Sequence, residues 1–530
     1  MSLPTLAELP PERAGENVFL HDGPLVDALV REGAGWAQEE LCRLGDIAGA
    51  PETIAWGFSA NEHPPTHVPY DRSGRRVDGL ELDEGWHRIM ELAVREGLHG
   101  APWADPRAGA HVARAAKFIV MAQVEAGFTC PIAMTYSCVP ALRLAPEIAA
   151  RWEPLVTGGQ YDPRPLAAVE KRGALIGMAL TERAGGSDVR GNATVARPIG
   201  NDEYECTGNK WFVSALMSDA YFILAQAPRG LSLLFVPRHE NGVRVDRLKR
   251  KLGNHSNPTG EVDLDGAVGT LVGEEGGGVR AIMSMIAGTR HDCVLGSVAV
   301  MRLGLSEALH WCAHRRAFGR TLAEQPAMRA VLADLALELE GATAGALRLS
   351  RAIDEGDDPL QRIVAPALKF WTCKRAPAHV AESVECLGGL GYIEESRLPR
   401  AYREAPLMSI WEGSGNVQAL DGLRALRTRP ECAEALLEEL ELARGTDSRF
   451  DQAVQALHGE LAAPSEDRAR ALATQTALCL QAALLLRHAP APVADAFCAT
   501  RLGGDGPGVF GMLPAAIDVE ALLARAWSAS

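Results

Sequence analysis

The chain has 530 residues, of which 47% are hydrophobic and 23% are charged, and its formal net charge is −15 at pH 7. This is the composition of a soluble globular protein, and the length is too great for one hydrophobic core, so we expect several domains. The negative charge excludes a protein that binds a polyanion over its whole surface, although it allows a local basic patch.

The first twelve residues contain no basic region followed by an apolar stretch, which argues against a secretory signal. No segment approaches the roughly 18 uncharged apolar residues that a membrane-spanning helix needs. We therefore expect a cytoplasmic protein without a membrane partner. The eleven cysteines are an odd number and form no C-x-x-C pair, which favours reduced and mostly buried thiols.

Helical spacing dominates the first third of the chain. Apolar residues recur three and four apart, as between Ala110 and Ala126, and predict an N-terminal helical domain over residues 1–169. The proline-rich stretch 61–70 interrupts this pattern and predicts an ordered loop.

The pattern changes near Lys171, where short apolar runs separated by turn residues predict strands. These runs are 174–181, 211–213, 220–225 and 231–236. Pro228, Arg229 and Gly230 join the last two runs and predict a hairpin turn. A small antiparallel β domain is therefore expected over residues 170–275.

Helical spacing then returns. Apolar residues from Met328 to Ile353 step by four and three and predict one long amphipathic helix within a bundle domain over residues 276–428. A further helical domain is expected over residues 429–530. The predicted fold is mainly α, with a helical domain, a central antiparallel β domain, a helical bundle and an extra C-terminal helical domain.

Two motifs in the predicted β domain are suited to a planar, phosphate-bearing ligand. The segment 185–188 (Gly-Gly-Ser-Asp) follows a strand and can cradle a phosphate through backbone N–H groups, with the hydroxyls of Thr181 and Ser187 as further donors; a plain β turn is the alternative. Trp211 and Ser214 offer an aromatic wall and a hydroxyl, although a half-buried core tryptophan has the same pattern.

The segment 314–319 (His-Arg-Arg-Ala-Phe-Gly) places two guanidinium groups beside an aromatic ring, which can grip a pyrophosphate; a solvated helix end is the alternative. His310 and His314 are four residues apart, as zinc-binding histidines often are. However, no HExxH carboxylate accompanies them and two cations follow, so no metal site is expected.

Glu412 stands between Ile410-Trp411 and a run of small residues. A carboxylate in this setting can lie against apolar surface while the neighbouring backbone approaches a ligand closely, which suits a proton-abstracting base. The same residues can also begin a helix, with the acid near the positive end of the helix dipole. Taken alone, the pattern leaves both interpretations open.

The order of these motifs resembles that of the acyl-CoA dehydrogenase family, from about residue 110 to residue 428. The matching stretches are 178–188, 208–214, 289–290, 315–319 with Gln325, 387–392 and 411–413. Three further stretches and the C-terminal section resemble the AidB branch of the family, whose members take part in the adaptive response to DNA alkylation. These stretches are 31–36, 251–257 and 409–416.

The resemblance implies an FAD cofactor. Thr181, Ser187 and Ser214 are then expected to bond the isoalloxazine and its phosphates, with Trp211 against the ring. Arg315, Phe318 and Gln325 are expected to hold the adenine half of an FAD bound mainly by a neighbouring subunit, which requires at least a dimer and favours a tetramer built as a dimer of dimers. The other expected cofactor contacts are Gly388, Gly389 and Asn416.

The resemblance also implies the chemistry of an oxidoreductase that acts on CH–CH groups. Glu412 is expected to take the α-proton of an acyl-CoA thioester while the β-hydrogen leaves as hydride to flavin N5. Hydrogen bonds to the thioester oxygen would stabilise the charge that develops there.

The alternative function is that of an AidB-like flavoprotein that associates with DNA, protects it against alkylation and has little dehydrogenase turnover. The resemblance assigns DNA contact to the C-terminal section, but residues 431–530 hold seven Arg, no Lys and fourteen acidic residues, a net charge of −7. Phosphate contacts need cations, so this balance weakens the alternative. The candidate DNA-binding residues are Arg424, Arg427 and Arg429.

Overall fold

The computed structural model describes residues 9–503 and 508–527, which form two compact units. Residues 1–8, part of the stretch considered above for a targeting signal, lie outside the described residues. The sheet unit comprises Glu52–Ala110 and Val124–Asp292. The helical unit comprises the chain up to Pro51, the segment His111–Gln123 and the chain from Cys293 onwards. The predicted domain boundaries at 169, 275 and 428 remain predictions.

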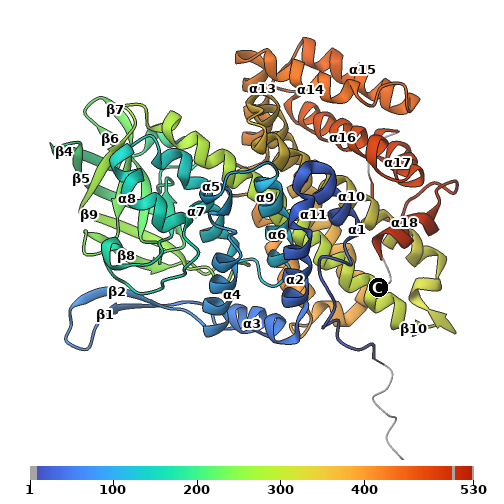
Figure 1. Ribbon diagram of the computed structural model, residues 1–530, viewed down its shortest axis with the longest axis horizontal. Helices are drawn as coiled ribbons and strands as arrows, with labels where there is room; N and C mark the ends of the chain where they lie inside the picture. Colours follow the sequence, from blue (N-terminus) through green and yellow to red (C-terminus); the bar gives the residue numbers. More distant parts are fainter. Residues whose placement is uncertain (1–8, 504–507, 528–530) are drawn as a thin grey trace, which may run out of the picture. The chain divides into compact units, whose positions relative to one another are not determined.

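A sheet of seven strands forms the centre of the sheet unit (Figure 1). The order β3-β6-β4-β5-β9-β7 closes on itself through a β6–β7 pairing, and β8 pairs with β9. Its strands are β3 (Ile176–Ala179), β4 (Val195–Gly200), β5 (Glu203–Ser214), β6 (Ala220–Ala227), β7 (Gly230–Pro237), β8 (Val243–Leu248) and β9 (Thr259–Val272). Most pairings are antiparallel, but β6 runs parallel to β3 and β4.

Alternation of side chains explains the core of this sheet. Tyr221, Ile223 and Ala225 lie two apart on β6 and share a buried cluster with Leu234 and Val236 of β7. The predicted turn joins these two strands, since Ala227 pairs with Gly230 across it, so the hairpin prediction is confirmed. The helices of this unit are α3 (Pro51–Glu62), α4 (Glu84–Arg95), α5 (Ala101–Ala104), α7 (Thr129–Leu142) and α8 (Pro146–Thr157).

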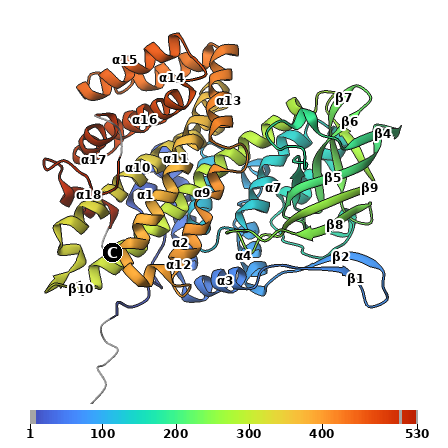
Figure 2. The same cartoon turned by 180° about the vertical axis from the view of Figure 1, so that it is seen from behind.

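The expectation of a loop over residues 61–70 is wrong in part. Strand β1 (Thr66–Tyr70) pairs antiparallel with β2 (Arg76–Glu81) in a two-stranded hairpin of the sheet unit (Figure 2). Pro69 lies where the register shifts between Val68 and Tyr70, and a two-stranded ribbon tolerates proline because one edge of each strand needs no partner. The prolines favour a loop, and the strand is evident only from its pairing with β2.

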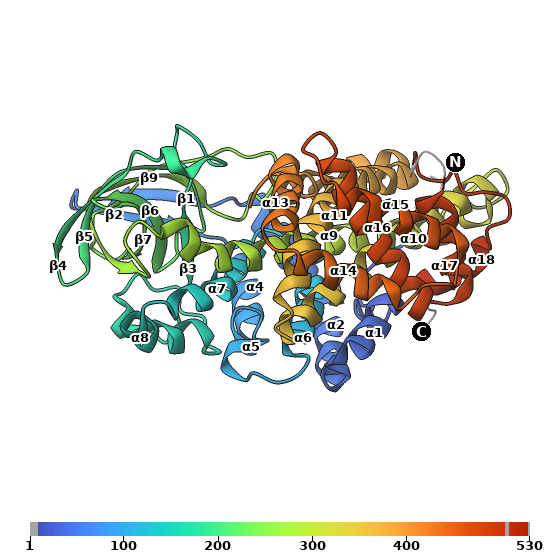
Figure 3. The same cartoon turned by 90° about the horizontal axis from the view of Figure 1, so that it is seen from above.

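The helical unit contains the long helices and the C-terminal section (Figures 1 and 3). Its helices are α1 (Gly23–Leu29), α2 (Gln38–Gly49), α6 (Ala110–Ala122), α9 (Gly278–His314, from Cys293 onwards), α10 (Pro326–Asp354), α11 (Asp358–Leu387), α12 (Arg397–Glu404), α13 (Gly415–Thr428), α14 (Glu431–Glu441), α15 (Ser448–Ala462), α16 (Ala469–His488), α17 (Ala491–Phe497) and α18 (Val519–Ala526). The predicted amphipathic helix falls within α10, whose apolar stripe is buried. The predicted fold class is confirmed.

Helices α9 and α16 are long and apolar enough to cross a membrane by length and composition alone. Their apolar windows are 94% and 72% buried inside the fold, as in core helices of soluble proteins, so they are weak evidence for a membrane span. All eleven cysteines are free thiols, and ten of them are buried. Over the described residues, no group of three or more His, Cys, Asp or Glu side chains is placed to hold a metal ion.

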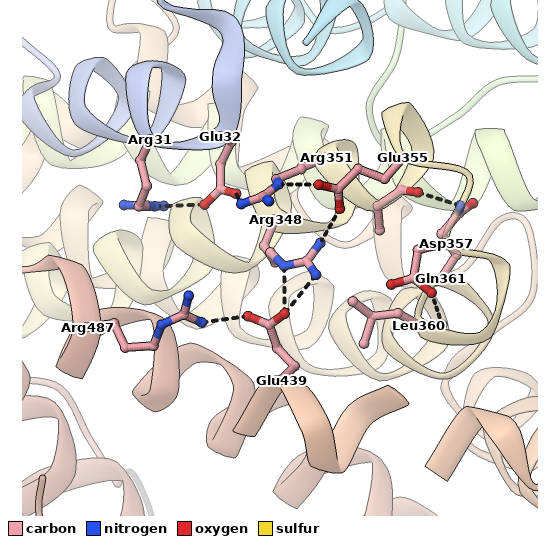
Figure 4. Close-up of polar contacts among 11 residues, drawn as sticks. Arg31, Glu32, Arg348, Arg351, Glu355, Asp357, Leu360, Gln361, Glu439 and Arg487 are labelled. Carbon is pink, nitrogen blue, oxygen red and sulfur yellow. Dashed lines mark hydrogen bonds and ion pairs between the residues drawn. The ribbon is translucent and has the colours of Figure 1, made fainter. Parts of the chain in front are cut away.

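A buried carboxylate ties the C-terminal section to the rest of the helical unit (Figure 4). Glu439 of α14 accepts hydrogen bonds from Arg348 of α10 at 3.0 and 2.7 Å and from Arg487 of α16 at 2.8 Å. The side chains of Glu439 and Arg348 are only 8% and 9% exposed. Burial alone raises the pKa of the Glu439 carboxyl, but the two guanidinium groups outweigh burial and hold that pKa below its usual range.

A Glu439→Gln variant is expected to unfold at a lower urea concentration. The change removes the closer of the two acidic partners of Arg348 and leaves Glu355 at 3.9 Å. We expect a loss of about 1.5–3 kcal/mol in the free energy of unfolding, the range for hydrogen bonds to charged groups. Since folding lowers the pKa of Glu439, its contribution is complete above about pH 4.3 and is lost as the pH falls through the folded value. The control is Glu441→Gln at an exposed pair with Arg444. Equal urea midpoints for the two variants would contradict the expectation.

Candidate functional site

The glycine-rich motif of the sheet unit forms a tight turn after β3. Glu182 and Gly185 exchange two backbone hydrogen bonds of 3.2 and 3.1 Å. A Cβ added to Gly186 would lie 3.0 Å from the hydroxyl oxygen of Thr181, so glycine lets the backbone pass close to that hydroxyl. Ser187 follows on the surface. The turn thus presents backbone N–H groups and two hydroxyls in one short segment, which suits an anionic ligand.

A buried ion pair holds this turn against the second motif on β5. Lys210 is fully buried, and its Nζ donates to Glu182 Oε1 and to the carbonyl of Leu224, both at 2.6 Å. Glu182 also accepts from the hydroxyl of Thr194 at 2.6 Å. Burial raises the pKa of the Glu182 carboxyl, but its hydrogen bonds to Lys210 and Thr194 lower that pKa by more. The sequence motifs did not reveal this pair.

The two motifs also meet through the backbone, because the N–H of Trp211 donates to the carbonyl of Thr181 at 2.9 Å. The structure therefore brings Thr181 and Trp211 together, as expected for residues of one site. The hydroxyls of Ser214 and Thr259 lie 3.3 Å apart at the end of β5.

Cations cover the ring of Trp211. Lys249 Nζ lies 3.6 Å from its centroid, and the guanidinium carbon of Arg183 lies 5.0 Å away. Phe212 is 52% exposed, and Lys249 Nζ also lies over its ring, 4.5 Å from the centroid. Sequence reasoning did not single out this phenylalanine, and the register of β5 shifts between Lys210 and Val213, so simple alternation could not assign it to a face. Phe212 is a second aromatic wall that the β domain can offer to a planar ligand.

In the helical unit, Phe318 is displayed at the tip of a small hairpin between β10 (Arg316–Ala317) and β11 (Arg320–Thr321). Phe318 and Gly319 both have positive φ, 53° and 84°, as a tight two-residue hairpin turn requires. The ring is 96% exposed. The side-chain amide of Gln325 donates to the carbonyl of Ala317 at 3.2 Å and so holds the hairpin. Arg315 lies over the ring of Trp311, 6.0 Å from its centroid.

The other predicted cofactor residues of this unit lie at helix ends. Gly388 ends α11 with φ 62°, and a Cβ added to it or to Gly389 would meet no atom within 4 Å. Their backbone is therefore accessible to a ligand. Asn416 lies in the first turn of α13, and its Oδ1 accepts a hydrogen bond of 2.7 Å from Arg470 of α16. Arg470 is a neighbour that the sequence motifs did not indicate.

Glu412 lies in the loop between η7 (Leu407–Ser409) and α13, with φ 58°. The stretch does begin a helix, as the alternative interpretation predicts, and Glu412 lies just before that helix. Helix α13 begins at Gly415, and Ser414 occupies its N-cap position without a side-chain capping bond. Trp411 packs against the buried residues Cys293, Cys373 and Met408, so the residue before Glu412 is anchored in apolar core. Glu412 is half-buried, in a conformation that non-glycine residues rarely adopt.

The three arginines proposed for DNA contact differ in their surroundings. Arg424 and Arg427 are exposed on α13, and Arg427 donates to the carbonyl of Pro464 at 3.3 Å. Arg429 bonds the carboxylates of Asp358 and Glu431 at 2.6 and 2.9 Å. Two acidic partners compensate its charge, which reduces its suitability for phosphate binding.

Comparisons with known proteins agree with the order of these motifs. The AidB N-terminal domain model matches residues 8–163, the middle domain of acyl-CoA dehydrogenases matches residues 177–267, and the C-terminal domain of acyl-CoA dehydrogenases matches residues 276–426. AidB of Escherichia coli (strain K12) is 44% identical over 501 residues, which cover 92% of this chain and 93% of the relative.

A second relative, acyl-CoA dehydrogenase family member 11 of Caenorhabditis elegans, is 31% identical over 78% of this chain and 70% of its own length. The crystal structure of Caenorhabditis elegans ACDH-11 in complex with C11-CoA matches with a TM-score of 0.84 at 26% identity, over 100% of this chain and 94% of that chain. These matches show that the chain belongs to the acyl-CoA dehydrogenase family, among the members that carry an AidB N-terminal domain.

Proposed function

We propose that this protein is an FAD-dependent oxidoreductase of the acyl-CoA dehydrogenase type, which removes two hydrogens from the CH–CH group of an acyl thioester. The observation that carries the proposal is the state of Glu412. Its backbone is left-handed, it lies outside any helix, and the residue before it is anchored in apolar core, which together support a catalytic role. Family membership supports the reaction class.

FAD fits the residues present. The turn and the hydroxyls of Thr181 and Ser187 suit its phosphates, and the exposed ring of Phe318 suits the adenine of an FAD bound mainly by a neighbouring subunit. Trp211, Ser214, Arg315, Gln325, Gly388, Gly389 and Asn416 are the other residues that we assign to it. When bound, FAD supplies the acceptor for the hydride.

The protein itself supplies the base. Glu412 takes the proton from the carbon next to the thioester carbonyl, and backbone or side-chain donors at the thioester oxygen stabilise the charge left behind. A relative that was crystallised with C11-CoA supports an acyl-CoA as the substrate class.

Anaerobic titration of the FAD-loaded protein with acyl-CoAs of increasing chain length tests this function. We expect bleaching of the oxidised flavin band by at least one thioester. If no thioester bleaches the flavin while dithionite does, the proposal is wrong. DNA association is the second function that the sequence resemblance implies, but the −7 charge of residues 431–530 and the paired state of Arg429 do not favour it. We place the protein in the cytoplasm.

A Phe318→Asn variant is expected to bind FAD about 10–100-fold more weakly. Asparagine tolerates the positive φ of this turn, so the hairpin is retained while the stacking surface, worth about 1–3 kcal/mol, is lost. Fluorescence titration of the apoprotein with FAD measures the affinity. The control is Tyr70→Asn, another exposed aromatic. Equal affinities for the two variants would contradict the assignment.

The ring of Phe318 is 96% exposed in one chain, which also suits contact with a second copy of the chain. We therefore propose that the protein forms a homotetramer.

A further inference from the structure

A buried lysine holds the loop that carries Glu412. Lys369 lies on α11 and is only 1% exposed. Its Nζ donates to the carbonyl oxygens of Met408 at 3.0 Å, Trp411 at 2.8 Å and Gly413 at 3.0 Å. A lysine ammonium has three N–H donors, and these three carbonyls satisfy all of them. The acceptors belong to one segment, residues 408–413, which is called the Glu412 loop below, and they lie on both sides of Glu412 in the sequence.

A glutamine completes the set of contacts to the same loop. Gln418 of α13 is 1% exposed, and its amide nitrogen donates to the carbonyls of Glu412 and Gly413, both at 2.9 Å. The carbonyls of residues 411, 412 and 413 are thus all bonded by side chains. Because each carbonyl fixes the plane of its peptide, the peptides before and after Glu412 are both fixed, and so is the direction in which the Glu412 side chain leaves the backbone.

The loop needs such support because its backbone is strained. Glu412 has φ 58° and Gly413 has φ 99°. A left-handed conformation costs a non-glycine residue about 1–2 kcal/mol, and it persists only where the surroundings impose it. A Cβ on Gly413 would lie 2.7 Å from the amide nitrogen of Gln418, so the contact also requires glycine at that position.

The placement of Lys369 on α11 argues against a role in helix packing alone. It shares a buried face of the helix with Pro366, Cys373, Ala376 and Val380, where an apolar residue would pack well. A buried ammonium in that position is costly unless it is fully hydrogen-bonded. Its partners are carbonyls of Met408, in η7, and of Trp411 and Gly413 in the loop that follows, and not groups of a neighbouring long helix.

We propose that Lys369 is a positioning residue that aims the Glu412 carboxylate by holding the carbonyls of its loop. The inference rests on the proposed function, in which Glu412 is the base. The lysine touches neither substrate nor cofactor in this role. It keeps the base in one direction before the substrate arrives, and a small misplacement of a catalytic group can lower a rate by about 100-fold.

The experiment compares Lys369→Met, Lys369→Arg and wild type as full-length, FAD-loaded proteins. Lys369→Met has similar length but no donor, and we expect at least about 10-fold faster amide exchange over residues 407–413, as expected for a locally opened loop. Flavin reduction by the best acyl-CoA should slow by about 100-fold with less than about threefold change in KM. Arginine can donate to two of the carbonyls, so Lys369→Arg should recover part of both losses.

Lys117→Met is the matched control, because Lys117 is also a buried lysine of the helical unit and bonds Glu40 at 2.7 Å. It should leave exchange over residues 407–413 and the reduction rate unchanged. If Lys369→Met does not fold, Gln418→Met removes the other bonds to the same carbonyls and should loosen the same residues. Wild-type exchange and wild-type reduction in the Lys369 or Gln418 variants would overturn the proposal. If no thioester reduces the wild-type protein, the proposed function is wrong. The exchange measurement would still show whether Lys369 holds the carbonyls of residues 408–413 in place.

Discussion

Flavin reduction by acyl-CoA is expected to fall by about 10²–10⁴-fold in a Glu412→Gln variant, the usual contribution of a positioned general base. Glutamine has nearly the same shape and hydrogen-bonds through its side chain, but it cannot accept the α-proton at neutral pH. The loop should remain in place, because Lys369 and Gln418 bond backbone carbonyls that the substitution leaves unchanged. Stopped-flow absorbance under anaerobic conditions measures the rate.

The controls separate loss of the base from loss of the cofactor. Glu412→Gln should bind FAD with wild-type affinity and should still be reduced by dithionite. Glu395→Gln, a change at an exposed carboxylate of the same unit, should leave the reduction rate unchanged. Unaltered reduction in Glu412→Gln would show that another group removes the proton. Normal reduction with lost FAD affinity would instead assign Glu412 to cofactor binding.

Periodic patterns allowed much of the fold to be predicted from the sequence. The apolar stripe of α10 and the alternating buried residues of β6 and β7 are local properties. The spacing of apolar residues within a helix or strand predicts which of its faces is buried. Strand β1 was missed because proline carries a strong signal for a loop and only the pairing with β2 shows that the strand forms. The parallel pairing of β3 with β6 is likewise a tertiary feature with no local signature.

The residues of the candidate site likewise divide into those with a local signal in the sequence and those without one. Glu412, Phe318 and the glycines could be proposed because they stand in motifs whose order along the chain is informative. Lys369 and Lys210 could not be proposed, because the partners of Lys369 are 39 to 44 residues away and those of Lys210 are 14 and 28 residues away. A lysine within an apolar stretch does not by itself indicate which group it bonds. The residues that were missed are those that hydrogen-bond the segments carrying the motif residues. Their identity depends on which carbonyl or carboxylate the fold brings within hydrogen-bonding distance.

The second large effect is expected from Lys210→Met, in the sheet unit. Methionine fills a similar volume but leaves the buried carboxylate of Glu182 without its cation. Removing one partner of a fully buried ion pair costs about 3–5 kcal/mol, so we expect a lower urea midpoint for this unit. The affinity for FAD should fall as well, because Glu182 directly follows Thr181 and Lys210 directly precedes Trp211, and the pair holds these two motifs together.

The pH dependence distinguishes an unpaired carboxylate from a simple packing defect. In wild type the pKa of Glu182 lies below its usual value, so the stability from this carboxylate is present above about pH 4.3 and is lost as the pH falls through the folded pKa. In Lys210→Met the buried carboxylate gains by taking up a proton. The difference in free energy of unfolding between variant and wild type should therefore narrow as the pH falls from 7 towards 5, where a packing defect would keep it constant.

A double variant completes this prediction. Glu182→Gln removes the charge that Lys210→Met leaves unpaired, while its amide oxygen can still accept from the hydroxyl of Thr194. The double variant should therefore be more stable than Lys210→Met alone, as expected when an isolated buried charge is the main cost. Arg197→Met, at an exposed pair with Glu205, is the control and should change stability by less than about 1 kcal/mol. If the double variant were no more stable than the single one, the loss would lie in the bond from Lys210 to the Leu224 carbonyl, and the pair would not be what joins the two motifs.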